Sequence, residues 1–308
     1  MDKQLFIATI LLCIIGLLSI VSASSRESVD RYGFDIYHFF NKQFIMILAG
    51  FIGTLVIACI PTKKYYKFTF GMWILIILAL IYMIFYIDPE RGSVNWLPLP
   101  IVGPVQPSEF AKPILIMILA LLFETVSRKG YEKGDVYGIN FLFKWAVLGC
   151  IIPVIVFIHG DLGTCLILFG ISGIMFIASP ISVKNKSRIV FGLIGIVCVG
   201  LLGIKAFRGY LLTEEQYSRL NYFNPCARYE DDGYQVCNGL IAVNNGGFKG
   251  LGIGKSKQKY SYIPDPHTDS IFAIIVEENG FILGSVIIML YMWMMIRIYK
   301  ISRNANTV

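Results

Sequence analysis

The chain has 308 residues, of which 56% are hydrophobic and only 15% are charged, and its formal net charge is +7. A soluble globular domain is nearer half apolar and a quarter charged, and here the apolar residues come in long blocks. The basic residues lie in short clusters between these blocks and form no continuous stripe, so we expect no nucleic-acid partner. The composition excludes an ordinary soluble enzyme and predicts a polytopic membrane protein.

Apolar runs of roughly 17–25 residues predict an all-α fold with about eight transmembrane helices. Clusters of lysine and arginine at 63–67, 128–133, 184–188 and 297–303 follow every second run. The positive-inside rule places them in the cytoplasm, together with both termini, and leaves a large extracytoplasmic loop at about 208–269. No repeat or linker divides the chain, so 1–308 is predicted to be one domain. The predicted spans are 5–22, 43–60, 68–87, 108–126, 139–158, 162–179, 189–207 and 270–297.

The cysteines give no metal-ligand spacing, and the chain has only three histidines. Cys226 and Cys237 both fall in the large outward loop, where oxidation is chemically available. A disulfide between them and two free thiols are both open. The other five cysteines lie in apolar runs and are most simply small core residues.

The motif QPSEFAK, residues 106–112, leads into the fourth predicted span. Ser108 is a candidate cap for that helix. Lys112 lies a turn inside the membrane, where an unpaired ammonium costs a few kcal/mol, so it needs a polar cavity or a partner charge. Glu109, three residues earlier on the same helix face, is the available partner. Asp161 opens the sixth span and is predicted to cap it.

A glycine-rich stretch at 245–254 carries Lys249 and is followed by Lys255, Lys257 and Lys259. The glycines permit close backbone approach and positive φ, and a phosphate-cradling loop is conceivable, although the spacing matches no known phosphate-binding fingerprint. Four lysines on an outward loop suggest an anionic ligand. A solvated or headgroup-facing surface explains them equally well.

The stretch PDPHTDSIFAIIVEENG, residues 264–280, contains the most informative charges. Asp269 sits where the loop meets the last span, and Thr268, Asp269 and Ser270 are all candidate helix caps. Glu277 lies two turns inside the helix, roughly 12 Å along its axis, and Glu278 follows it. Carboxylates at that depth indicate a functional site. General-base catalysis on an anionic lipid and proton-coupled transport both fit.

At these residues the sequence resembles the SEDS family (shape, elongation, division and sporulation), which comprises the FtsW, RodA and SpoVE proteins. The similar motifs are GLLSIVSASS at 16–25, Trp96, QPSEFAK, DLGT at 161–164, RLNYFNP at 219–225, and GLIAVNNGGFKGLGIGKSKQKYSYIPDPHTD at 239–269. The resemblance covers essentially the entire chain, and the last motif is closer to FtsW than to RodA.

The resemblance implies a peptidoglycan glycosyltransferase of the bacterial plasma membrane that polymerises lipid II, extending a glycan linked to undecaprenyl pyrophosphate. Asp269 would be the general base, and Lys112 and the loop cations would steady the pyrophosphate. The implied partners are a class B penicillin-binding protein and other divisome or elongasome proteins. No resident cofactor or metal ligand is expected, and a divalent cation would enter only with the pyrophosphate. The predicted substrate-binding residues are Trp96, Glu109, Lys112, Lys249, Lys255, His267 and Glu277.

The chain departs from the family pattern in four respects. Asn95 replaces a basic residue, Ser270 replaces Phe, and the turn at 159–161 reads His-Gly-Asp where Pro-Asp is usual. The chain stops at Val308, whereas family members typically have ten spans, so we expect a truncated member, a fragment or a divergent paralogue. A lipid II flippase or transporter, and a catalytically inactive divisome scaffold, are the alternative functions.

Overall fold

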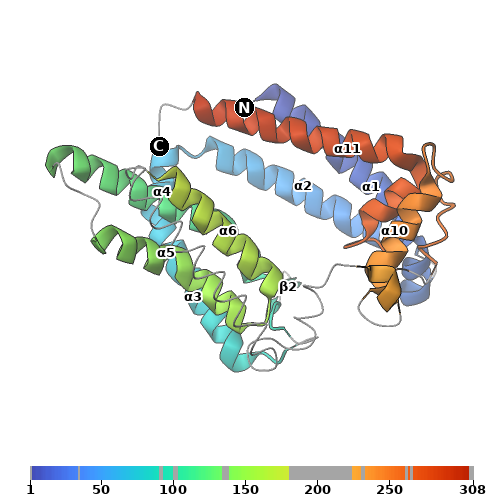
Figure 1. Cartoon of the computed structure of the whole chain (residues 1–308), viewed down its shortest axis with the longest axis horizontal. Coiled ribbons are helices and arrows are strands. Elements are labelled where there is room, and N and C mark those ends of the chain that lie inside the picture. The colour runs from blue at the N-terminus through green and yellow to red at the C-terminus, as the bar shows by residue number, and fades with distance from the viewer. Residues whose placement is uncertain are drawn as a thin grey trace. The chain divides into compact units, whose positions relative to one another are not determined.

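The computed structural model of the chain is mostly helical (Figure 1) and describes residues 2–33, 35–89, 93–99, 103–133, 139–179, 224–229, 233–260, 263 and 266–304. The chain forms two compact units. The first unit comprises Met1–Cys59 and Asn221–Thr307, and the second comprises Ile60–Leu220 with Val308. Each unit is described by itself below, and a single domain over 1–308 stays a prediction.

The first unit is built on two long helices, α1 (Lys3–Tyr32) and α11 (Ile271–Arg303), which pack against each other. Helix α2 (His38–Cys59) packs on α1, and α10 (Tyr234–Gly246) packs on α11 and on the short 3₁₀ helix η1 (Pro225–Arg228). Asp2 caps α1 by accepting hydrogen bonds from two backbone N–H groups of its first turn. Asp2 also pairs with the Arg297 guanidinium, which holds the pKa of that carboxyl below its ordinary value. The start of α1 and the last turns of α11 therefore lie at the same end of the unit.

Helix α11 is broken at Gly280, which has φ 79° and ψ 177°. The loop after α10 fits into the break: Leu251 N–H donates to Glu277 O at 2.9 Å, and Phe281 N–H donates to Gly247 O at 2.8 Å. A Cβ on Gly280 would lie 2.3 Å from Phe248 O, so only glycine allows this approach. The predicted continuous span at 270–297 is therefore two helical segments joined by a kink.

The second unit contains helices α3 (Thr62–Tyr86), α4 (Pro107–Lys133), α5 (Ile139–Ile158) and α6 (Leu162–Ala178). Their apolar faces meet in one core, in which Leu80, Leu115, Ile152 and Leu168 are almost completely buried. Two short antiparallel strands, β1 (Leu97–Leu99) and β2 (Gly103–Val105), connect α3 to α4. The all-α prediction is thus wrong in this small detail, because the proline-rich loop closes on itself as a hairpin.

Helix length supports an integral membrane protein. Four described helical stretches are long and apolar enough to cross a bilayer: Lys3–Tyr32, His38–Cys59, Lys67–Tyr86 and Ile271–Arg303. Helix α1 spans about 45 Å, longer than a hydrocarbon core of about 30 Å, and it continues for ten residues past the end of the predicted span at residue 22. Two shorter apolar helices are Phe143–Ile158 and Leu162–Ala178. The seventh predicted span, 189–207, and the basic cluster at 184–188 lie outside the described residues, so the span count and the topology stay predictions.

Candidate functional site

The predicted site residues divide between the two units. Asp269, Lys249, Lys255, His267 and Glu277 belong to the first unit. Trp96, Glu109 and Lys112 belong to the second unit.

Asp269 is exposed immediately before the start of α11. The helix begins at Ile271 and its N-cap is Ser270, whose side chain makes no capping hydrogen bond. The Asp269 carboxylate makes no hydrogen bond or ion pair with any residue that the structure describes. Capping, the alternative explanation for this aspartate, does not account for its position. The carboxylate is free to accept a proton from a ligand.

His267 lies two residues before Asp269 and contacts helices α1 and α2. Its Nδ1 is 2.8 Å from the Glu27 carboxylate on α1, and its ring centroid lies 4.2 Å from that of Phe39 on α2. These contacts fix the approach to Asp269. A direct contact between His267 and substrate stays a prediction.

Glu277 is completely buried in the first half of α11. Its carboxylate accepts hydrogen bonds from Asn245 Nδ2 at 3.3 Å, from Gln258 N at 3.2 Å and from the Ser256 hydroxyl. All three donors come from the segment between α10 and α11 or from α10 itself. A role of Glu277 in substrate binding stays a prediction, and its partners in this structure are internal.

Glu278 forms a buried ion pair that the sequence reading missed. Lys259 Nζ lies 2.9 Å from Glu278 Oε1, with side-chain exposures of 2% and 4%. Ser22 on α1 completes the group, because its hydroxyl donates to Glu278 Oε1 at 2.7 Å and accepts from Lys259 Nζ at 3.0 Å. A buried carboxylate requires an opposite charge, but nothing in the sequence distinguishes Lys259 from the other three loop lysines.

The glycine-rich loop is shaped by packing. A Cβ on Gly246 or Gly250 would lie 2.1 or 2.2 Å from a backbone carbonyl oxygen of α11. The N–H groups of Leu251 and Gly252 donate to helix carbonyls, so they are not available to cradle a phosphate. Close backbone approach is confirmed as the reason for the glycines. The lysines that remain available to an anion on this loop are those with exposed side chains, Lys249, Lys255 and Lys257.

In the second unit, Lys112 Nζ lies 2.6 Å from Glu109 Oε1, one turn earlier on α4. The predicted partner of this lysine is confirmed. The predicted cap is wrong: α4 begins at Pro107, so Ser108 lies buried inside the first turn. Proline fits the first helical position because its missing N–H would have no intrahelical partner there. Trp96 is about half exposed, directly before β1.

Asp161 caps α6 as predicted, because its Oδ1 accepts the N–H of Thr164 at 3.0 Å. Its other oxygen accepts from Gln106 Nε2 at 3.4 Å, which connects the turn to the start of α4. Gly160, before it, has φ 82°, a conformation that a proline ring cannot adopt. The glycine in place of the usual proline therefore matches the backbone of this turn.

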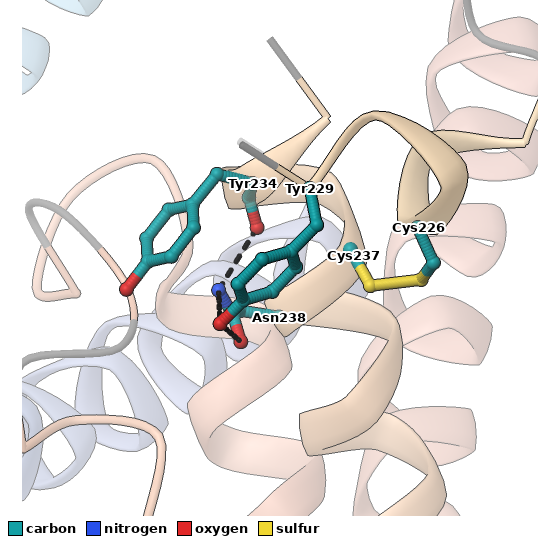
Figure 2. The surroundings of a disulfide bond; sticks show 5 residues. All are labelled: Cys226, Tyr229, Tyr234, Cys237 and Asn238. Atoms are coloured by element: carbon teal, nitrogen blue, oxygen red, sulfur yellow. Dashed lines mark hydrogen bonds between the residues drawn. A yellow bond between two sulfur atoms is a disulfide. The ribbon is translucent and has the colours of Figure 1, made fainter. Parts of the chain in front are cut away.

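Cys226 and Cys237 form a disulfide that joins η1 to α10, with a Cα–Cα distance of 4.9 Å (Figure 2). Beside it, the buried Asn238 side chain donates to Tyr234 O at 3.0 Å and lies 3.5 Å from the Tyr229 hydroxyl. The two tyrosine rings pack at 4.9 Å between centroids. Of the two states that the sequence left open, the structure has the bonded one.

Reduction of this disulfide is expected to loosen α10. The bond closes a short loop between residues separated by 11 positions, and such a closure contributes about 3 kcal/mol. Amide hydrogen exchange in α10 should therefore accelerate by up to about 10²-fold in reductant. The double variant Cys226→Ser with Cys237→Ser is the control, since its exchange should not respond to reductant. Unchanged exchange in reduced wild type would contradict this prediction.

Within the described ranges, no group of three or more His, Cys, Asp or Glu side chains is arranged to hold a metal ion.

Comparison with known proteins places these motifs in a family. The FtsW/RodA/SpoVE profile, described as "Cell cycle protein", matches residues 3–308. The chain is 31% identical over 300 residues to the probable peptidoglycan glycosyltransferase FtsW of Bacillus subtilis, covering 93% of this chain and 72% of that protein. It is 30% identical over 310 residues to stage V sporulation protein E of the same organism, covering 96% and 78%.

Solved structures show the same fold. A chain from a peptidoglycan synthase complex that coordinates polymerization and crosslinking aligns with a TM-score of 0.67 at 17% identity, covering 98% of this chain and 79% of that one. A mutant of the rod shape determining protein RodA of Thermus thermophilus aligns with a TM-score of 0.62 at 17% identity, covering 99% and 76%. The profile match over nearly the whole sequence, with relatives at 30% identity and above, shows that this chain belongs to the FtsW/RodA/SpoVE family of cell cycle proteins.

Proposed function

We propose that this chain is a membrane peptidoglycan glycosyltransferase that polymerises lipid II into glycan strands for cell division or cell-shape maintenance. The observation that carries the proposal is the Asp269 carboxylate, which is exposed and without a partner among the described residues, directly before helix α11. The similarity to relatives named as probable peptidoglycan glycosyltransferases supports the reaction type. Helix length and composition support insertion in the membrane, and we assign the bacterial plasma membrane.

Asp269 acts as the general base in this proposal. It takes the proton from the 4-hydroxyl of the acceptor sugar while that oxygen forms a bond to the anomeric carbon of the growing glycan. The bond between that carbon and the undecaprenyl pyrophosphate breaks, and the pyrophosphate leaves with the electron pair. A free carboxylate suits this role because a salt bridge or a cap would compete for its lone pairs.

Positive charge is required where the pyrophosphate leaves, since negative charge builds on its oxygens. In the first unit, we assign this role to the exposed side chains of Lys249 and Lys255. In the second unit, we assign it to Lys112, whose ammonium is held by Glu109. Trp96 offers an exposed indole for a sugar face. A divalent cation would arrive with the pyrophosphate as part of the substrate.

A class B penicillin-binding protein is the proposed partner, since glycan strands must also be crosslinked. The support is the structural similarity to a chain of a complex that coordinates polymerization and crosslinking. Divisome or elongasome proteins are the proposed wider assembly.

Purified protein in detergent, supplied with labelled lipid II, tests the proposed activity. Glycan strands are expected. Lipid II crossing a vesicle membrane without polymer formation would indicate a flippase. Partner binding with neither activity would indicate a scaffold.

The Lys112–Glu109 pair provides a second test of the site. Lys112→Met is expected to lower both protein level and activity, because it leaves Glu109 without its partner. The double variant Lys112→Met with Glu109→Gln should recover protein level, since both charges are gone. Polymerisation should stay low in the double variant, because a thioether cannot steady the pyrophosphate. Near-normal polymerisation by the well-expressed double variant would show that Lys112 is only half of a structural ion pair.

A further inference from the structure

The loop that enters the kink of α11 presents two apolar side chains to its surroundings. Phe248 is 76% exposed and Ile253 is 78% exposed. The ring centroid of Phe248 lies 6.0 Å from that of Phe281, which is itself exposed directly after the kink. Water solvates such an apolar group poorly, so its exposure on one short loop indicates a surface that contacts something else. We call residues 247–255 the loop tip.

The backbone of the loop tip is held at one level of the first unit. Gly252 N–H donates to Glu278 O at 2.9 Å, on the near side of the kink. Phe281 N–H, on the far side, donates to Gly247 O at 2.8 Å. The loop tip therefore lies level with the kink of α11, and its polar backbone groups have partners there.

The helices of the first unit indicate where this level lies in a bilayer. Two polar contacts join α1 to α11: Asp2 pairs with Arg297 at one end, and the Ser22 hydroxyl donates to Glu278 at the other. Asp2 and Ser22 are about 30 Å apart along α1, which matches the thickness of a hydrocarbon core, about 30 Å. Between the two contacts, α11 carries no charged side chain and α1 carries only Lys3, next to Asp2. The loop tip, level with Glu278, thus lies where the hydrocarbon core meets the headgroups.

The charges of the loop suit a headgroup layer. Lys249 and Lys255 lie in the loop tip with exposed side chains, and Lys257 follows them. No acidic residue occurs between positions 247 and 259, and these three lysines form no ion pair with any residue that the structure describes. Basic side chains at a membrane surface are attracted to anionic lipids, and apolar side chains beside them enter the boundary of the acyl chains.

We propose that the loop tip is a membrane-binding surface. It inserts Phe248 and Ile253 among the acyl chains of the adjacent leaflet and sets Lys249 and Lys255 against the phosphates of anionic headgroups. The predicted topology places this leaflet on the side opposite the cytoplasm. The inference does not depend on the proposed reaction, and it is compatible with the role assigned to these lysines, because a lipid-linked pyrophosphate lies at the same depth.

A nitroxide label measures the depth of the loop tip in the intact protein. The five cysteines outside the disulfide are replaced by alanine, and the label is attached to Ile253→Cys, which leaves Phe248 in place. The protein is placed in nanodiscs of phosphatidylglycerol and phosphatidylcholine. Collisions of the label with oxygen, which concentrates in lipid, are compared with its collisions with a water-soluble nickel chelate. We expect oxygen collisions to exceed nickel collisions at position 253.

Two exposed positions on α1 calibrate this measurement. Leu18→Cys places a label one turn from Ser22 toward the middle of the membrane, and Asp30→Cys places one about 12 Å beyond Ser22 on the other side. The ratio of oxygen to nickel collisions at position 253 should be close to that at position 18. A ratio equal to that at position 30 would overturn the proposal, because the loop tip would then be solvated. Protection from both reagents would also overturn it, because protein would then cover the surface.

The lipid composition tests the part assigned to the lysines. In nanodiscs of phosphatidylcholine alone, the ratio at position 253 should fall by about twofold or more, because the attraction between the lysines and a negative surface is lost. The ratio at position 18 should not change, since that side chain lies on a membrane helix. An unchanged ratio at position 253 would contradict the contact between these lysines and anionic headgroups.

Discussion

Asp269→Asn is expected to lower the rate of lipid II polymerisation by about 10²-fold or more, with little change in protein level or thermal stability. Asparagine keeps the size of the side chain but cannot accept the acceptor proton. Stability should hold because Asp269 is exposed, Ser270 is the helix N-cap, and no described residue bonds to the carboxylate. The measurement is strand formation from labelled lipid II by purified wild-type and variant protein.

Asp88→Asn is the matched control for this experiment. Asp88 is another exposed aspartate beside a helix end, and it makes no hydrogen bond or ion pair with the residues that the structure describes, so its replacement should leave polymerisation unchanged. Asp269→Glu should retain part of the activity, because it keeps a carboxylate at a shifted distance. Wild-type polymerisation by Asp269→Asn would show that Asp269 is not the general base.

Lys259→Met is expected to produce the largest loss of stability, about 3–5 kcal/mol. The change leaves the Glu278 carboxylate buried at 4% exposure with no opposite charge. The double variant Lys259→Met with Glu278→Gln should recover most of the loss, because an apolar group and a neutral amide need no charge partner. The measurement is the thermal unfolding midpoint in detergent, together with the protein level in membranes.

Lys257→Met controls for the loss of a loop lysine as such. Lys257 is exposed two residues from Lys259 and should change stability by no more than about 0.5 kcal/mol. Two outcomes would contradict a stabilising role of the ion pair. One is an unfolding midpoint of Lys259→Met equal to that of Lys257→Met, and the other is a double variant that is no more stable than Lys259→Met alone. Polymerisation by the stable double variant then reports whether this anchor also holds the Asp269 loop in its active position.

The buried Lys259–Glu278 ion pair also connects the segment before α11 to helix α1. Lys259 ties the loop to α1 through Ser22, and His267 ties it to α1 through Glu27. These anchors lie ten and two residues before Asp269 in the sequence. Two residues that precede Asp269, the proposed general base, therefore each contact helix α1.

The sequence by itself determined the features that depend on neighbouring residues. Apolar runs predicted the described long helices, because a membrane helix must satisfy its backbone internally and present apolar side chains to lipid. The Lys112–Glu109 pair and the Asp161 cap were predictable because helical geometry brings residues three apart together. The Asp269 assignment came from family resemblance, and the structure adds that its carboxylate has no partner among the described residues.

Only the tertiary structure decided the contacts between residues far apart in the chain. Ser22 and Glu278 are separated by 256 positions, and no local pattern encodes their meeting. The kink at Gly280 was hidden inside a continuous apolar run, because its cause is a loop backbone that packs against the helix from outside. Hydrophobic periodicity reports which face of a helix is apolar, whereas the choice of Lys259 over its neighbours depends on which side chain reaches a buried charge once the helices have packed.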